Sequence, residues 1–281
     1  MERYSIIRDK MPREFVLLQG TGCRWGRCEF CDYHTDVSDD PFEVNRRVLE
    51  QVTGEYGVLD VINSGSAMEL DDRTIELLRR VIVEKNIHTL WCEMHWMYRN
   101  RLEEFRLKIT DERFNPLPLR GLPLKQGENM GTIYCHPVSR DAACCVLTSE
   151  GGEGNNFQLS TLNSQLLIKF RCGVETFDGE LRKRWNKGVP EAVTAEDVAK
   201  YFQGVCLLCC TEGETHERIV HDIELARRYF EYFSVNVFCN NTTNIKRDPE
   251  LVEWFVREVY PTIKDDPRIE VLIDNTDLGV G

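Results

Sequence analysis

The sequence predicts an α/β protein whose parallel sheet curls into a partial, TIM-like (β/α)6 barrel, with an insertion between the third and fourth units. Short apolar runs alternate along the chain with amphipathic, charged segments, which is the pattern of repeated strand–helix units. Polar and glycine-rich residues directly follow the apolar runs. In parallel barrels these positions meet at one face of the sheet, where the active site lies.

The predicted elements follow from this alternation. We expect strands at 14–20, 58–64, 88–94, 166–173, 204–210 and 234–240, with a further edge strand at 268–274. We expect helices near 42–55, 72–85, 98–107, 194–202, 216–231 and 249–259. In the second helix, for example, Leu78, Val81 and Ile82 recur at helical spacing.

The segments that follow the strands supply the candidate site. They are Gly20–Cys23, Ser64–Ser66, Glu93–His95, Gly173–Thr176, Thr211–Gly213 and Asn240–Thr242. Residues 109–163 interrupt the pattern, because they contain many prolines and glycines and show no sustained period. Such a long irregular stretch is uncommon inside a compact domain. We interpret it as an insertion (a lid, a hairpin or a disordered loop) within a single domain of residues 1–281.

Composition argues against several classes of function. The 281 residues carry a formal net charge of −12, whereas binding to nucleic acid depends on Lys and Arg side chains that neutralise phosphates. We therefore do not expect an intact polynucleotide as a partner. No apolar run approaches the ~20 residues of a membrane helix, and the first residues lack the apolar run of a signal peptide. A cytoplasmic protein with reduced cysteines and a small-molecule or nucleotide substrate fits these observations.

Cys23, Cys28 and Cys31 form a C-x4-C-x2-C motif directly after the first predicted strand. Three thiolates this close in sequence can hold three irons of a [4Fe–4S] cluster and leave the fourth iron open to a substrate or cofactor. Together with His34 they could instead form a Cys3His zinc site. Structural zinc usually organises domains with little core, and the ample apolar sequence of this chain favours iron.

The motif resembles that of the radical S-adenosylmethionine superfamily, C-x3-C-x2-C with an aromatic residue before the last cysteine, except for one extra residue in the first gap. Phe30 is the aromatic residue here. The resemblance implies a [4Fe–4S] cluster on the three cysteines and S-adenosylmethionine as the second cofactor. An external electron donor, such as flavodoxin or ferredoxin, would reduce the cluster, and cofactor cleavage would yield a hydrogen-abstracting 5′-deoxyadenosyl radical. The cofactor contacts that we expect are Phe30, Tyr33, Ser64, Gly65, Ser66, Arg171 and Glu175.

In chain length, cysteine spacing and its compact barrel, the sequence looks most similar to the queuine lyases. These enzymes release queuine from queuosine 5′-phosphate by ribose hydrogen abstraction and cleavage of the glycosidic bond. Acidic and amide groups would suit the amine and diol of that substrate, and a basic segment, 182–188, would suit its phosphate. The same segment is also typical of a solvated helix end. We expect Glu93 and His95 to be catalytic, and the full set of substrate contacts to be Glu93, His95, Lys187, Asn236, Asn240 and Asp274.

Two other functions are compatible with the sequence. The first is a radical enzyme that modifies another substrate, such as a tRNA base or a peptide. The second is a non-enzymatic zinc-binding protein. Cys206, Cys209 and Cys210 lie in an apolar predicted strand, and this favours a packed barrel interior over a second cluster.

Overall fold

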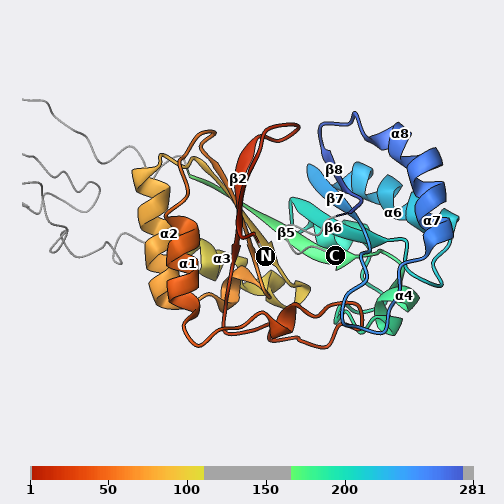
Figure 1. The fold of residues 1–281 in the computed structure, drawn as a ribbon, viewed down its shortest axis with the longest axis horizontal. Helices are drawn as coiled ribbons and strands as arrows, with labels where there is room; N and C mark the ends of the chain where they lie inside the picture. The colour runs from red at the N-terminus through yellow and green to blue at the C-terminus, as the bar shows by residue number, and fades with distance from the viewer. Residues whose placement is uncertain (1, 111–165, 275–281) are drawn as a thin grey trace, which may run out of the picture.

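A computed structural model describes residues 2–110 and 166–274. These residues form one sheet of eight strands, which follow one another in sequence order. Neighbouring strands from β2 to β8 pair in parallel, and β1 pairs antiparallel with β2. The sheet curls, with β1 and β8 at its two edges (Figure 1). The predicted partial barrel is therefore confirmed.

The bounds of the elements are as follows. The strands are β1 (Tyr4–Ile7), β2 (Arg13–Leu18), β3 (Val58–Asn63), β4 (Thr89–Met94), β5 (Leu167–Glu175), β6 (Gly204–Cys209), β7 (Tyr232–Val237) and β8 (Ile269–Leu272). The α-helices are α1 (Pro41–Leu49), α2 (Asp72–Glu84), α3 (Leu102–Thr110), α4 (Gly179–Arg184), α5 (Ala195–Ala199), α6 (His216–Tyr229), α7 (Pro249–Trp254) and α8 (Tyr260–Ile263). A π-helical turn, Phe255–Val259, joins α7 to α8. The 3-10 helices of the described residues are η1 (Tyr33–Thr35), η2 (Ala67–Glu69) and η3 (Trp96–Arg101).

Each expected strand and helix is present, with shifted ends. The sequence did not predict β1, which has only four residues, or the extent of α4, which starts before the basic segment and ends in it. The side chain of Asp178 starts α4 by accepting a hydrogen bond from Leu181 N at 2.8 Å. The expected insertion at 109–163 lies outside the described residues, except for residues 109 and 110, which complete α3. In the described ranges, no helix has the length and apolar character needed to cross a membrane.

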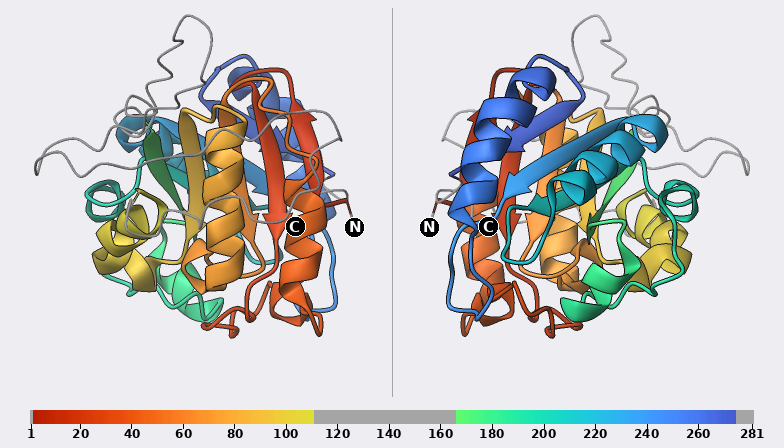
Figure 2. Two further views of the ribbon diagram at one scale, coloured as in Figure 1. Left: turned by 90° about the vertical axis from the view of Figure 1, so that its left-hand side faces the viewer. Right: turned by 90° about the vertical axis from the view of Figure 1, so that its right-hand side faces the viewer.

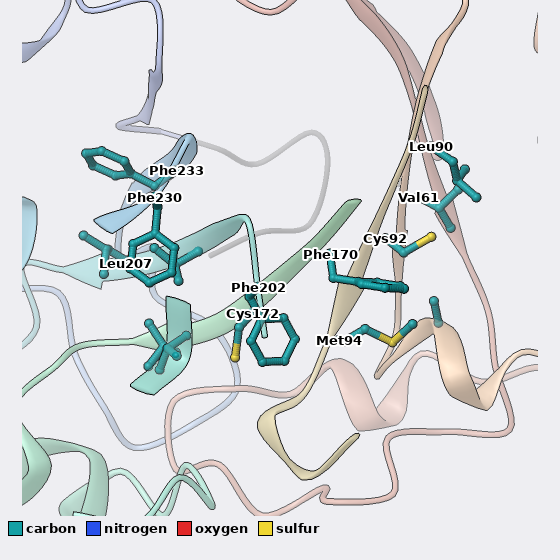
Figure 3. Packing of buried hydrophobic residues seen from close by; sticks show 14 of the residues in the cluster. Val61, Leu90, Cys92, Met94, Phe170, Cys172, Phe202, Leu207, Phe230 and Phe233 are labelled. Atoms are coloured by element: carbon teal, nitrogen blue, oxygen red, sulfur yellow. The ribbon is translucent and has the colours of Figure 1, made fainter. Parts of the chain in front are cut away.

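The two faces of the sheet differ because strand side chains alternate. One face packs on the helices, and its core includes Val61, Cys92, Phe170, Leu207 and Phe233 (Figure 3). Helices α1 to α3 lie outside the first strands and α6 to α8 outside the last ones (Figures 1 and 2). The other face of the curled sheet carries most of the polar side chains described below, so it provides the site.

Candidate active site

Charged side chains from five strands meet on the concave side of the sheet. Asp60 on β3 accepts hydrogen bonds from Arg13 Nε of β2 at 2.9 Å and from Arg171 of β5 at 3.0 and 3.1 Å. Arg13 also reaches Glu270 on β8 at 2.8 Å, and Arg171 lies 3.7 Å from Glu93 on β4. Because β2 and β8 are not neighbours in the sheet, nor are β3 and β5, these groups share an inner space. We call this space the lumen.

Ion pairing affects the protonation of Asp60 and of Glu93 differently. Burial by itself raises the pKa of Asp60, but Arg171 and Arg13 outweigh it and hold that pKa below its usual value. For Glu93 burial dominates over the more distant Arg171, so its pKa is raised. Glu93 also keeps 25% of its side chain accessible. The lumen therefore contains a reachable carboxyl group whose negative charge is only partly compensated.

The end of β5 places a second carboxylate beside a lysine. The strand has a bulge between Gly173 and Glu175, and Glu175 adopts a left-handed backbone conformation with φ of 67°. Lys187 Nζ donates to Glu175 Oε1 at 2.7 Å. A Cβ atom on Gly173 would lie 2.9 Å from that oxygen, so glycine leaves room for the ion pair. Burial lowers the Lys187 pKa, but the opposite charge of Glu175 raises it by more, so Lys187 remains a cation.

The cysteine motif lies in the segment between β2 and α1. Cys28 and Cys31 pack against a small apolar cluster that includes Phe30, Trp185 and Phe238. Burial raises the pKa of Cys28 to about 11 and that of Cys31 to about 12. Such thiols become thiolates when a metal binds them. Among the residues with described positions, no three His, Cys, Asp or Glu side chains are arranged for a single metal ion.

A loop from the far end of the chain holds the cysteine loop in place. Asn241 Nδ2, after β7, donates to Phe30 O at 2.7 Å. The backbone and hydroxyl of Thr242 donate to Asp32 Oδ2 at 3.1 and 2.7 Å. The expected site residue Asn240 is exposed, and its Oδ1 instead accepts from Arg247 N within the same loop at 2.9 Å. Asn241 and Thr242 therefore hold the cysteine loop, whereas Asn240 does not contact it.

The Ser64–Ser66 turn after β3 lies against the cysteine loop. Ser64 Oγ donates to Asp36. A Cβ atom on Gly65 would lie 3.0 Å from Cys23 Cα and 2.2 Å from Glu69 Oε2, so this approach requires glycine. Glu69, which the sequence did not suggest, is held by three donors at 3.0, 3.2 and 2.7 Å, namely Ser66 N, Arg24 N and the Tyr98 hydroxyl.

His95 connects this turn with the segment that carries Lys187. Its backbone N donates to Ser66 Oγ at 2.9 Å, and its ring stacks on Trp25 with centroids 5.7 Å apart. Nδ1 accepts from Met97 N at 3.2 Å, so Nε2 carries the proton and donates to Lys187 O at 2.8 Å. Burial, with the Lys187 charge, lowers the pKa of His95 to about 4. The ring is therefore neutral at pH 7, and both nitrogens are used inside the protein.

We expect His95 to make the fold sensitive to acid. Between pH 6.5 and about 4 the unfolded chain binds a proton that folded His95 does not, so the free energy of unfolding falls as the pH drops. The loss should be about 2 kcal/mol at pH 5. In urea unfolding at pH 7 and pH 5, His95→Gln should lose correspondingly less stability than the wild type. His221→Gln, which changes an exposed histidine, should retain the full loss, and equal losses in all three proteins would contradict this assignment.

The remaining expected residues are Asn236, Tyr33 and Asp274, and they lie in different parts of the structure. Asn236 lines the lumen at 2% exposure, and its Oδ1 has no hydrogen-bond partner in the described part of the chain. Tyr33 is half-buried at the start of η1, in the cysteine loop. Asp274 lies apart from the lumen residues, because its side chain is 75% exposed and pairs with Arg247 at 2.8 Å. Asn236 thus shares the lumen face of the sheet with Glu93 and Arg171, whereas Asn240 and Asp274 are exposed.

The basic segment 182–188 includes the C-terminal end of α4, but only part of it is solvated. Arg182 is buried, and its Nη2 donates to the carbonyl oxygens of Glu191 and Val193 at 3.2 and 2.7 Å. Lys187 is buried as well, which leaves Lys183 and Arg184 as the exposed cations of the segment. The interpretation as a solvated helix end is therefore wrong for Arg182 and Lys187.

Comparison with known proteins identifies the family. No protein family model and no curated protein matches the sequence. The solved structure of a queuine lyase from Clostridium spiroforme, bound to SAM and queuine, is 34% identical, with a TM-score of 0.75 and coverage of 100% of this chain and 99% of that one. SuiB from Streptococcus suis aligns at 13% identity and a TM-score of 0.45, over 92% of this chain and 48% of its own. At 34% identity over the full length, the chain belongs to the queuine lyase family of radical S-adenosylmethionine enzymes.

Proposed function

We propose that the protein releases queuine from queuosine 5′-phosphate by abstracting a ribose hydrogen atom and breaking the glycosidic bond. The observation that carries this proposal is the full-length similarity to a queuine lyase whose structure holds SAM and queuine. The lumen supports it, because it combines a reachable carboxyl group with buried polar atoms that have no partner in the described chain. Such atoms are suited to a small polar substrate.

Cys23, Cys28 and Cys31 are the proposed ligands of a [4Fe–4S] cluster. Three thiols in one loop are a suitable donor set, and the charge of a bound metal would offset the burial that raises the pKa of Cys28 and Cys31. Apolar side chains beside them exclude water, and Lys187 adds a positive charge nearby. When bound, the cluster and S-adenosylmethionine supply one-electron reductive cleavage, for which flavodoxin or ferredoxin is the proposed electron donor.

The segments next to the cysteine loop are proposed to bind S-adenosylmethionine. They contribute Phe30, Tyr33, the Ser64–Ser66 turn and Glu175. Asn63, directly before the turn, has a buried Oδ1 without a partner in the described residues. A buried acceptor of this kind is costly unless a donor satisfies it, so we assign it to the amino group of the cofactor.

Glu93 is proposed to bind the secondary amine of the substrate. A carboxyl group whose pKa burial has raised gains most from a cation placed beside it. Arg171 Nε and Asn236 Oδ1, both buried and without partners in the described chain, provide a donor and an acceptor for substrate hydroxyl groups. Together these three residues provide contacts for the secondary amine and the diol of the substrate.

His95 and Lys187 have positioning roles in this proposal. Both ring nitrogens of His95 are occupied, by Lys187 O and by Met97 N, and its backbone N holds Ser66 of the Ser64–Ser66 turn. Lys187 Nζ lies 5.4 Å from the Phe30 ring centroid and pairs with Glu175. It therefore belongs to the cofactor side of the lumen, and we do not assign it to the phosphate.

The test is release of queuine by purified, anaerobically reconstituted protein. With dithionite, S-adenosylmethionine and queuosine 5′-phosphate, mass spectrometry should detect queuine and 5′-deoxyadenosine, and omission of S-adenosylmethionine should abolish both. A panel of tRNA and peptides serves as the comparison. If 5′-deoxyadenosine formation responds to a tRNA or a peptide and not to the nucleotide, the proposal is wrong and the enzyme has another substrate.

Replacing Glu93 with glutamine should impair use of the nucleotide. Loss of one charge-assisted contact of about 1.5–3 kcal/mol should lower kcat/KM for queuine release by about 10- to 100-fold. Steady-state kinetics over a range of nucleotide concentrations would measure this change. Asp274→Asn changes an exposed carboxylate away from the lumen and should leave kcat/KM unaltered. A Glu93→Gln enzyme with the kcat/KM of the wild type would remove Glu93 from the substrate site.

A further inference from the structure

Cys206 is a thiol of the lumen wall. It lies on β6, where its neighbours Val205 and Leu207 belong to the core on the helix side of the sheet. Cys206 Sγ instead donates to Glu93 Oε2 at 3.7 Å, within the sulfur hydrogen-bond range. Cys172 and Cys209, by contrast, are part of the helix-side core. Strand alternation thus separates the lumen thiol from these core thiols.

The strands on either side of β6 each carry a buried polar atom that calls for a ligand. Arg171 is 3% exposed and Asn236 is 2% exposed, yet Arg171 Nε and Asn236 Oδ1 lack partners in the described chain. A buried polar atom without a partner costs about 1–3 kcal/mol, so a bound polar molecule would satisfy both. The register pairs Cys206 with Gly173 on β5 and with Ser234 on β7. The thiol therefore lies on the strand between these two unpartnered groups.

The chemical state of the thiol suits transfer of a hydrogen atom. Burial, followed by the nearby carboxyl of Glu93, raises the Cys206 pKa well above its usual value, and the guanidinium of Arg171 only partly opposes this. The sulfur consequently keeps its hydrogen at neutral pH and is a poor nucleophile. A thiol S–H bond is weak enough to give its hydrogen to a carbon radical, whereas the O–H bond of a serine is not.

We propose that Cys206 is a catalytic residue that donates a hydrogen atom to the sugar radical left when the base departs. This inference rests on the proposed function, in which the base leaves the ribose radical with the electron pair of the glycosidic bond and a proton from a sugar hydroxyl, so that the unpaired electron stays on the sugar fragment. In the step itself a C–H bond forms as the S–H bond breaks, and Cys206 becomes a thiyl radical. One electron from the external one-electron donor and one proton from solvent then restore the thiol.

Solvent deuterium tests the proposal directly, because the Cys206 S–H exchanges with water. In D2O the sugar product of the wild-type, cluster-loaded enzyme should carry one deuterium on carbon. Cys206→Ser exchanges the thiol for the hydroxyl of a side chain of the same shape that still donates a hydrogen bond, and its product should contain solvent deuterium only at background level. Cys209→Ser removes a thiol from the opposite face of β6 and should retain the label. Product made in H2O and then moved to D2O measures exchange without the enzyme.

A binding measurement separates chemistry from a change in pocket shape. A calorimetric titration should show that cluster-loaded Cys206→Ser binds queuine with the same affinity as the cluster-loaded wild type. The inference is overturned if the wild-type product is unlabelled, or if the Cys206→Ser product carries as much label as the wild-type product. In both cases the proposed release of queuine is unaffected. Loss of label together with loss of queuine affinity also overturns it, since Cys206 would then shape the pocket. If the wild type releases no queuine, the proposed function fails and this inference fails with it.

Discussion

Replacing Asp60 with asparagine is expected to lower the free energy of unfolding by about 3–5 kcal/mol, the usual cost of removing one partner from a buried ion pair. Asp60 is fully buried and is the carboxylate that faces both Arg13 and Arg171. Without its charge, two buried guanidinium groups from β2 and β5 would lose their shared counter-charge. Urea unfolding of the wild type and the variant under the same anaerobic conditions measures the difference.

The helix α1 offers a matched control on the surface. Glu43 also faces two arginines, Arg46 and Arg47, at 2.8 and 3.0 Å, but these pairs are open to solvent. Exposed ion pairs contribute little because water screens them. Glu43→Gln should therefore unfold at nearly the same urea concentration as the wild type. Equal losses in Asp60→Asn and Glu43→Gln would show that the lumen network does not hold the strands together.

Replacing Cys28 with alanine is expected to abolish both iron binding and queuine release. With two thiols left in the loop, the cluster would lack a third protein ligand, and the cofactor would have no reductant beside it. The wild type should contain about four iron and four sulfide per chain, and the variant should be colourless after the same reconstitution. Elemental analysis and the visible absorption spectrum measure this independently of turnover.

Cys239→Ala is the matched control for this loss. Cys239 is half-buried after β7, outside the cysteine loop, so its removal should leave the iron content unchanged. Iron retained in Cys28→Ala would remove Cys28 from the ligand set. A wild type that takes up stoichiometric zinc and no iron after reconstitution would contradict the proposed cluster.

The fold could be read from the sequence because its signals are local. Apolar runs alternate with amphipathic helices, and each strand–helix unit repeats the same pattern. The positions of the strand ends followed from this, and the structure places the cysteine loop, the Ser64–Ser66 turn and Glu93 at those ends as expected. The strand β1 was missed, since a four-residue edge strand buries too little to show a pattern.

The lumen contacts could not be predicted, because they depend on distant residues. Asp60 stands alone in an apolar run, and its partners Arg13 and Arg171 lie 47 and 111 positions away. The buried position of Lys187 had no sequence signal either, since four nearby cations suggest a solvated surface. A charge inside a strand is nevertheless informative, because burial there requires a counter-charge on another strand.

The long-range anchoring of the cysteine loop has a consequence for biosynthesis. Phe30 and Asp32 receive their hydrogen bonds from residues 211 and 210 positions later in the chain. The loop therefore reaches its final shape only after the ribosome has released the segment beyond β7. We therefore expect a cluster to be loaded only after the segment beyond β7 has been synthesised, because nascent chains that stop before it lack a properly held acceptor loop.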